Sequence, residues 1–231
     1  MLTQTGGDIV GVWLTGRCRY RCFVALDTSV RDAPRRLLEH RRHLVREFAA
    51  GGVESPGFFR SEFRSWYQNR NITSFLKPLI TSSALVFDIG ANQGVWTKAF
   101  RDRDATVVAV EPQATCCLAL EREFSGDRRV RIVSKAVGSQ EGEAVLYSDV
   151  PGMEQASMAP DWMDDLRGAQ VMPAHAWGGA GKLVPVTTLD ALIAAFGRPE
   201  YCKIDVEGSE PEVLGGLSQA IPALSFEFHR A

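Results

Sequence analysis

The sequence lacks a long hydrophobic run, and this absence restricts where the protein is expected to reside. A membrane-spanning helix needs about 20 consecutive apolar residues, and no stretch of the 231-residue chain approaches that length. The opening MLTQTGGDIV also lacks the charged and then apolar layout of a secretory signal. We therefore expect a cytoplasmic protein with no membrane partner.

Cysteine is too scarce to form a disulfide framework or a zinc site. The five cysteines are an odd number in a chain long enough to fold around a core without cross-links. The pairs Cys18/Cys22 and Cys116/Cys117 have no second Cys or His pair at zinc spacing. We expect reduced structural thiols.

A large excess of one charge is missing too, because the formal net charge is only -2. Residues 1–80 nevertheless hold 13 of the 26 Lys and Arg but only 7 of the 28 Asp and Glu. No helix-turn-helix, zinc-finger or RNA-binding motif accompanies this basic part, so we interpret it as a solvated helix face. We predict no nucleic-acid partner.

The composition, 45% hydrophobic and 23% charged, is that of a globular protein with one principal core. Patterns before residue 81 are weak: short strand-like segments up to residue 30, then amphipathic helices predicted at 35–50 and 59–67. We interpret residues 1–80 as a helical or irregular extension and residues 81–231 as the main domain.

From residue 84, strand-like and helical segments alternate, which predicts an α/β fold: a parallel sheet with helices on both faces. An insertion rich in Gly, Pro, Met and Trp, residues 151–181, has the length of a functional lid. The predicted strands are 84–90, 106–112, 130–137, 142–149, 201–208 and 223–229, and the predicted helices are 95–100, 115–124, 186–196 and 209–217.

The turn after the first of these strands, DIGANQG (88–94), is the main functional motif. Its glycines allow a ligand to approach the backbone, and the next helix would offer free N–H groups there. The spacing DxGxNxG departs from the dinucleotide motif GxGxxG, and Asn92 is a residue type that tolerates positive φ. The Asp88 carboxylate would repel a pyrophosphate but attract a cationic ligand, such as the methionine part of S-adenosylmethionine (SAM).

A second acid, Glu111, ends the following strand, TVVAVEP (106–112). An acid about 20 residues beyond a glycine turn holds the ribose hydroxyls in doubly wound nucleotide-binding folds. Together with Asp88 and the turn, Glu111 indicates a nucleoside-like cofactor.

The motifs together resemble the FkbM-type SAM-dependent methyltransferases, over roughly residues 84–229. The resemblance rests on FDIGANQG, VVAVEP, KAVG (135–138), VTTLD (186–190), SFEFH (225–229) and, most specifically, KIDVEGSEPEVLGG (203–216). It implies a Rossmann-like class I methyltransferase fold, SAM as cofactor and O-methylation. The implied cofactor-binding residues are Asp88, Gly90, Ala91, Asn92 and Gly94 at the turn, Glu111 and Pro112 at the ribose, and Ala136 near the adenine.

Candidate catalytic residues follow the strand that contains KIDVEG. A methyl acceptor must be positioned against the methyl group, and an acceptor hydroxyl benefits from a general base. We expect Asp205 to be that base, with Lys203 on the same face of the strand and Glu207 at its carboxyl end. The alternative is an ion pair between Asp205 and Lys203 that only fixes the loop. Ser209 and Glu212 match a capping box and are left out of the site.

The last predicted strand carries Ser225, Glu227 and His229 on one face. His229 is a further candidate base, although a histidine at a strand end is as often simply solvated. The acids and histidine at these strand ends lack a ligand-spacing signature, so we assign no metal site.

The chain has no segment after residue 229 for the final helix and hairpin of the methyltransferase fold. The last strand would then be an open edge. A truncated product, a homodimer that covers the edge, or an N-terminal segment that fills it would each account for this.

We predict an enzyme that moves a methyl group from SAM to a hydroxyl of a small molecule, such as a sugar or secondary metabolite. The alternatives are a catalytically inactive module of the same fold and a nicotinamide-dependent oxidoreductase, which Asp88 and the missing GxGxxG oppose.

Overall fold

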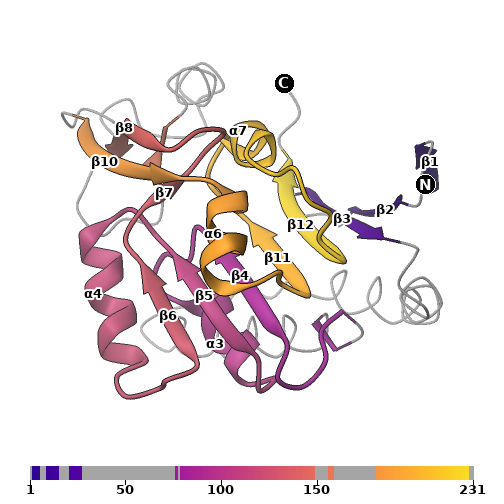
Figure 1. The fold of residues 1–231 in the computed structure, drawn as a ribbon, viewed down its shortest axis with the longest axis horizontal. Coiled ribbons are helices and arrows are strands. Elements are labelled where there is room, and N and C mark those ends of the chain that lie inside the picture. The colour runs from indigo at the N-terminus through magenta and orange to yellow at the C-terminus, as the bar shows by residue number, and fades with distance from the viewer. Residues whose placement is uncertain are drawn as a thin grey trace, which may run out of the picture.

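The computed structural model describes residues 2–5, 9–15, 21–27, 76–77, 79–148, 156–158 and 181–228. Two sheets organise these residues (Figure 1). An eight-stranded sheet carries the alternating strands and helices, and a four-stranded sheet lies across the carboxyl ends of its parallel strands. This mostly parallel sheet with helices confirms the predicted α/β class.

Five strands of the large sheet run parallel, in the spatial order β6, β5, β4, β11 and β12. Each strand coincides with a mostly apolar segment of the sequence, as expected where helices cover both faces of a sheet. The strands are β4 (Leu85–Ile89), β5 (Thr106–Val110), β6 (Val130–Val133), β11 (Tyr201–Ile204) and β12 (Ala223–Phe228).

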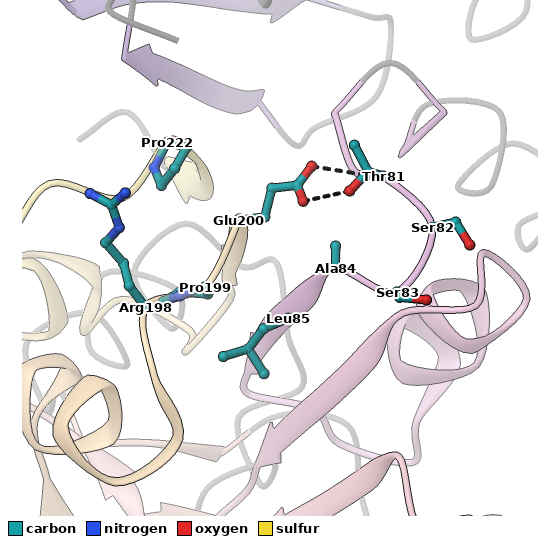
Figure 2. A pocket seen from close by; sticks show the side chains of 9 residues that line it. All are labelled: Thr81, Ser82, Ser83, Ala84, Leu85, Arg198, Pro199, Glu200 and Pro222. Carbon is teal, nitrogen blue, oxygen red and sulfur yellow. Dashed lines mark hydrogen bonds between the residues drawn. The ribbon is translucent and has the colours of Figure 1, made fainter.

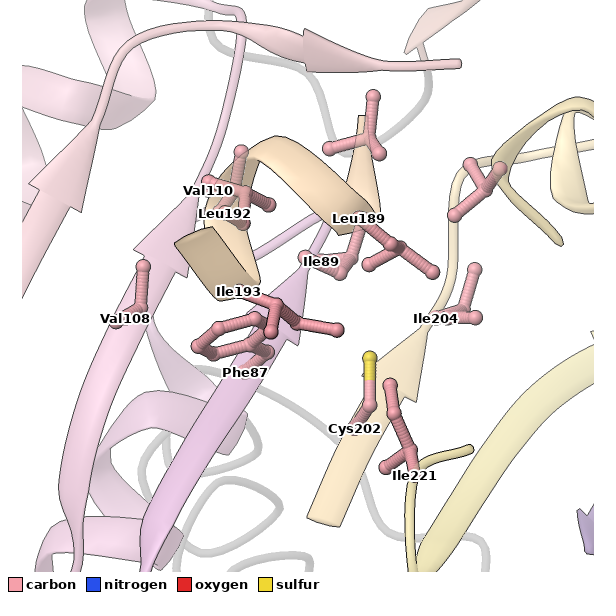
Figure 3. Packing of buried hydrophobic residues seen from close by; sticks show 12 residues of the cluster. Phe87, Ile89, Val108, Val110, Leu189, Leu192, Ile193, Cys202, Ile204 and Ile221 are labelled. Atoms are coloured by element: carbon pink, nitrogen blue, oxygen red, sulfur yellow. The ribbon is translucent and has the colours of Figure 1, made fainter. Parts of the chain in front are cut away.

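The core forms on both faces of this sheet because side chains alternate along each strand. Val86 of β4 packs with Phe100 of α3, whereas Phe87 and Ile89 pack with residues of α6, including Leu192 (Figure 3). The helices are α3 (Val95–Arg101) and α4 (Ala114–Glu123) on one face, and α6 (Leu189–Phe196) and α7 (Glu210–Gly215) on the other.

The second sheet has the order β7, β10, β8 and β9. It corrects one prediction: residues 130–137 do not form a single strand. β6 ends at Val133, and the backbone turns so that Ala136 and Val137 pair with β10 instead. The strands are β7 (Ala136–Val137), β8 (Gly142–Ser148), β9 (Ala156–Ser157) and β10 (Lys182–Thr187).

Two further predicted boundaries are wrong. The helix expected at 186–196 starts later, because Val186 and Thr187 end strand β10 and Thr188 is the N-cap, its side chain accepting from the Ala191 N–H. The strand expected at 201–208 stops at Ile204, which leaves residues 205–208 as a loop at the carboxyl end of the strand. A polar N-cap in one case and a loop in the other interrupted the apolar patterns.

The edge of β12 is occupied by the N-terminal part of the chain. β3 (Arg21–Asp27) pairs antiparallel with β12, and β2 (Ile9–Thr15) and β1 (Leu2–Thr5) extend the sheet outward. Of the three arrangements expected for this edge, the structure has the N-terminal segment beside it. The division of the chain near residue 80 stays a prediction, although strands from both sides share one sheet.

Some predicted segments lie outside the described residues. These are the helices at 35–50 and 59–67 and most of the insertion at 151–181. Within the part of the chain that is described, no helix has both the length and the apolar character to cross a bilayer.

Candidate active site

The candidate site lies at the carboxyl ends of three adjacent parallel strands, β5, β4 and β11. Asp88 is in register with Lys203 of β11 on one side and with Ala109 of β5 on the other. Ligands bind at this end of open α/β sheets. The predicted turn, Glu111 and Asp205 are therefore neighbours in space.

The turn at residues 90–94 depends on positive backbone φ angles. Gly90 has φ +73° and Gly94 φ +90°, and Asn92 has φ 49°, as its residue type suggested. At Gly90 a Cβ would lie 1.8 Å from the Asp205 carbonyl oxygen. The glycine therefore lets the turn touch the loop after β11 backbone to backbone.

The N–H groups of the turn itself, residues 90–94, donate within the chain, and the N–H groups expected at the start of the next helix stay a prediction. Gly90 and Ala91 donate to the Val110 carbonyl at 3.0 and 3.1 Å, and the Asn92 N–H donates to Glu111 Oε2 at 2.9 Å. Gln93 N–H donates to the Asn92 side chain, and Gly94 N–H to the Ala91 carbonyl. Three of these N–H groups bond to Val110 and Glu111 at the end of β5 and two bond within the turn, so none of the five remains for a phosphate.

Asp88 is fully buried, at 0% exposure. Its Oδ2 accepts a 2.6 Å hydrogen bond from the Thr97 hydroxyl of α3. Its Oδ1 has no hydrogen bond but lies 3.3 Å from the Lys203 ammonium. Asp88 is therefore enclosed under the turn that follows it, with its carboxylate next to the Lys203 ammonium.

Glu111 is buried at the end of β5 and fastens the turn. Its two carboxylate oxygens accept the N–H groups of Asn92 and Gln113, both at 2.9 Å. Burial raises the pKa of Glu111, and the two backbone hydrogen bonds act in the opposite direction. A carboxylate has about four acceptor positions, so capacity for further donors remains.

Lys203 and Asp205 lie together at the end of β11. The Lys203 ammonium donates to the Gly90 carbonyl at 2.8 Å and lies 3.5 Å from Asp205 Oδ2. The Lys203 side chain is 5% exposed and that of Asp205 is 36% exposed. The two predicted residues thus differ in access: Asp205 borders solvent, whereas Lys203 lies beneath the turn.

The loop at residues 205–208 is held by residues that sequence reasoning missed. Glu207 has φ 55°, and its carbonyl accepts a 2.6 Å hydrogen bond from Ser157 of β9. Buried Glu210 accepts the N–H groups of Val206 and Gly208 at 3.0 and 3.1 Å. The insertion and the start of α7 therefore both fix this loop.

The predicted capping box on α7 is wrong. Ser209 is at the N-cap but makes no side-chain capping bond, and Glu212 is exposed. Glu210, one residue into the helix, accepts the preceding N–H groups instead. The adjacent acids and proline satisfied the sequence pattern, but the side chain that turns inward differs from the expected one.

The structure describes three of the four remaining predicted site residues. Ala91 is buried beside Leu120 of α4, and Pro112 is half-buried after Glu111. Ala136 is buried in the second sheet with Val186, its register partner. His229 lies outside the described residues.

A separate hollow of about 400 Å³ lies at the opposite end of the strands (Figure 2). Glu200 borders it and accepts hydrogen bonds from the Thr81 N–H and hydroxyl. Because it adjoins the amino ends of β4 and β11, it is distant from the turn. Among the described residues, no group of three His, Cys, Asp or Glu side chains is arranged to hold a metal ion.

Comparison with known proteins places these features in a family. The model described as "Methyltransferase FkbM domain" matches residues 88–230. A solved structure from Methanococcus maripaludis, provisionally described as an S-adenosyl-L-methionine-dependent methyltransferase, matches 36% of this chain and 45% of its own, at 15% identity and TM-score 0.25. That similarity is too low to carry an argument, and the curated proteins contain no significant match. Because the family model spans more than half of its residues, the chain belongs to the FkbM methyltransferase domain family.

Proposed function

We propose that this protein is a SAM-dependent methyltransferase that methylates a hydroxyl group of a small molecule. One observation carries the proposal beyond family membership. Two buried acids, Asp88 and Glu111, flank one glycine turn at the ends of adjacent strands. Such a site favours a cationic nucleoside over a phosphorylated one.

The residues at the turn fit this cofactor. Gly90 leaves the backbone open where a Cβ would clash, and the buried Asp88 Oδ1 has no hydrogen bond. Glu111 retains acceptor capacity for ribose hydroxyls, and Pro112 and Ala136 would border the nucleoside. SAM would supply the methyl group as a positively charged sulfonium.

The same geometry opposes the nicotinamide-dependent alternative. A dinucleotide needs N–H donors for its pyrophosphate. The N–H groups of residues 90–94 already donate within the chain, and two carboxylates lie beside them. A pyrophosphate at residues 90–94 would meet two carboxylates and would find none of these five donors free.

On the acceptor side, Asp205 would take the proton from the hydroxyl that is methylated. Its side chain is 36% exposed at the carboxyl end of β11, and the backbone beside it touches the turn. Glu207 and His229 remain alternative bases. Lys203 makes its contacts within the chain, so we give it no direct chemical role.

The test combines calorimetry with a methylation assay. The wild type should bind SAM and S-adenosylhomocysteine (SAH) and transfer labelled methyl to members of a hydroxylated metabolite library. Asp205→Ala should lose far more turnover than cofactor affinity, because a base acts in the transition state. Glu212→Ala, an exposed acid outside the site, is the matched control and should keep both.

The outcomes separate the alternatives. A folded protein that binds neither SAM nor SAH at millimolar concentration would contradict the proposal. Cofactor binding without transfer to any acceptor would favour an inactive module. Equal turnover by the Asp205→Ala variant would remove Asp205 from the catalytic role.

A further inference from the structure

Lys203 is an almost fully buried cation of the site, and its surroundings point to a specific task. Four oxygen atoms of the chain lie within 3.5 Å of its ammonium nitrogen. They are the Gly90 carbonyl at 2.8 Å, Asp88 Oδ1 at 3.3 Å, the Ile89 carbonyl at 3.4 Å and Asp205 Oδ2 at 3.5 Å. An ammonium has three N–H donors. Two of the contacts, to the Gly90 and Ile89 carbonyls, are hydrogen bonds, and the two carboxylates are ion-pair neighbours.

The electrostatics oppose proton transfer by this side chain. Burial alone would lower the pKa of Lys203, but the carboxylates of Asp205 and Asp88 outweigh burial, so the net pKa is raised. The side chain therefore stays an ammonium at neutral pH. A residue that stays charged and is 4% exposed is poorly suited to accept a proton from a substrate.

The contacts join two segments that are far apart in sequence. The carbonyls of Ile89 and Gly90 belong to the start of the turn, whereas Asp205 belongs to the loop after β11. The backbones also meet there, since the Asp205 N–H donates to the Ile89 carbonyl at 3.1 Å. The Lys203 ammonium therefore lies between the Asp205 carboxylate and the backbone carbonyls of this turn and contacts both.

We propose that Lys203 is a positioning residue that couples the orientation of the Asp205 carboxylate to the conformation of the turn at residues 90–94. This inference rests on the proposed function only in two assignments: the turn binds the cofactor, and Asp205 is the base that deprotonates the acceptor hydroxyl. The coupling is a property of the ligand-free protein. Because of this coupling, a change in the turn at residues 90–94 is accompanied by a change in the loop at residues 205–208.

Hydrogen–deuterium exchange of the ligand-free protein tests the coupling. In Lys203→Met, exchange at residues 89–94 and 205–208 should rise about tenfold or more, because buried polar groups lose their charged partner. The matched control is Lys98→Met, which removes an exposed lysine paired with Asp102 at 3.3 Å. It should leave both segments unchanged.

A second variant keeps the test decisive if Lys203→Met does not fold. Asp205→Asn changes a partly exposed side chain that reaches the turn through Lys203. Exchange at residues 89–94 should rise in this variant too. Unchanged exchange there in Asp205→Asn, or in a folded Lys203→Met, would overturn the proposal.

SAH titrations of the same variants distinguish this inference from the proposed function. If the wild type binds no SAH, the proposed function fails, while the exchange data still decide the role of Lys203. If the wild type binds SAH, Lys203→Met should bind it about tenfold more weakly. A Lys203→Met variant with normal exchange and SAH affinity but no methyl transfer would make Lys203 a direct participant and reject the positioning role.

Discussion

Individual buried charges in this protein are arranged with partners, and the partners decide what each charge does. Lys203 matched the expected position on its strand, yet its ammonium lies among backbone carbonyls and carboxylates. Asp88 matched as well, yet it lies under the turn at 0% exposure. Sequence spacing located both residues, but it could not tell which of them would be accessible, because accessibility depends on neighbouring strands.

Gly90 offers a direct test of how closely the two loops approach. Gly90→Ala should lower the free energy of unfolding by about 3 kcal/mol or more, because the new Cβ meets the Asp205 carbonyl and φ is positive. Gly126→Ala is the control: φ is +80° there, but nothing lies within 4 Å of the new Cβ, so about 1 kcal/mol is expected. Urea unfolding measures both. Equal costs would contradict the close approach.

Glu210 makes a prediction about pH. Burial raises its pKa above the usual 4.5, against the effect of its backbone hydrogen bonds. A carboxyl whose pKa is raised by folding stabilises the protein below pH 4.5, and this contribution is lost as pH rises through the folded pKa. The free energy of unfolding of Glu210→Gln, measured relative to that of the wild type, should therefore increase from pH 4.5 toward neutral, because only the wild type loses stability over this range. Urea titrations with no such trend would contradict the assignment.

Among the elements, those with a long apolar run were predicted and those that end at a polar signal were misplaced. α3, α4, β5 and β12 agree with the predicted segments to within about two residues, an ordinary uncertainty at element ends. The helix near 186 and the strand near 130 were placed wrongly because each apolar run continues across a change of element. Near residue 134 the backbone passes from the large sheet to the second sheet, and at Thr188 it passes from strand β10 to helix α6.

The N-cap of α6 tests one of these corrections. Thr188→Ala should destabilise the protein by about 1 kcal/mol, because the Thr188 hydroxyl oxygen accepts from the Ala191 N–H at 3.1 Å. Ser209→Ala is the matched change at the N-cap of α7, where no side-chain capping bond forms, and should cost less. Thermal unfolding of both variants measures the difference. A larger cost at Ser209 would restore the capping box on α7.

For the whole molecule, the main consequence of the fold is the protection of the last parallel strand. β12 would be an open edge without β3, and an open edge pairs readily with other chains. Since β3 lies there, the reason for expecting a homodimer at this edge is removed, and the oligomeric state stays a prediction. The large sheet thus uses residues from both ends of the described chain.

Deletion of residues 1–27 tests this protection. The deleted protein should self-associate and unfold at lower urea concentration, because it loses the antiparallel partner of β12. Deletion of residues 1–5 removes only β1, the outermost strand, and serves as the control. Light scattering after gel filtration measures association. If the longer deletion stays monodisperse and as stable as the control, the pairing of β3 with β12 contributes little.

The sequence by itself determined the α/β class, the glycine turn with its two acids, and the family to which those motifs belong. These features are local: a run of apolar residues, a glycine or asparagine with positive φ, and an acid at a strand end are each set by nearby residues. Only the tertiary structure decided that Lys203 lies beneath the turn, that Glu210 and Ser157 hold the loop after β11, and that β3 covers β12. Apart from the local bonds of Glu210 to Val206 and Gly208, those contacts join residues about 50 to 200 positions apart, and non-local pairing of this kind depends on how the whole chain packs.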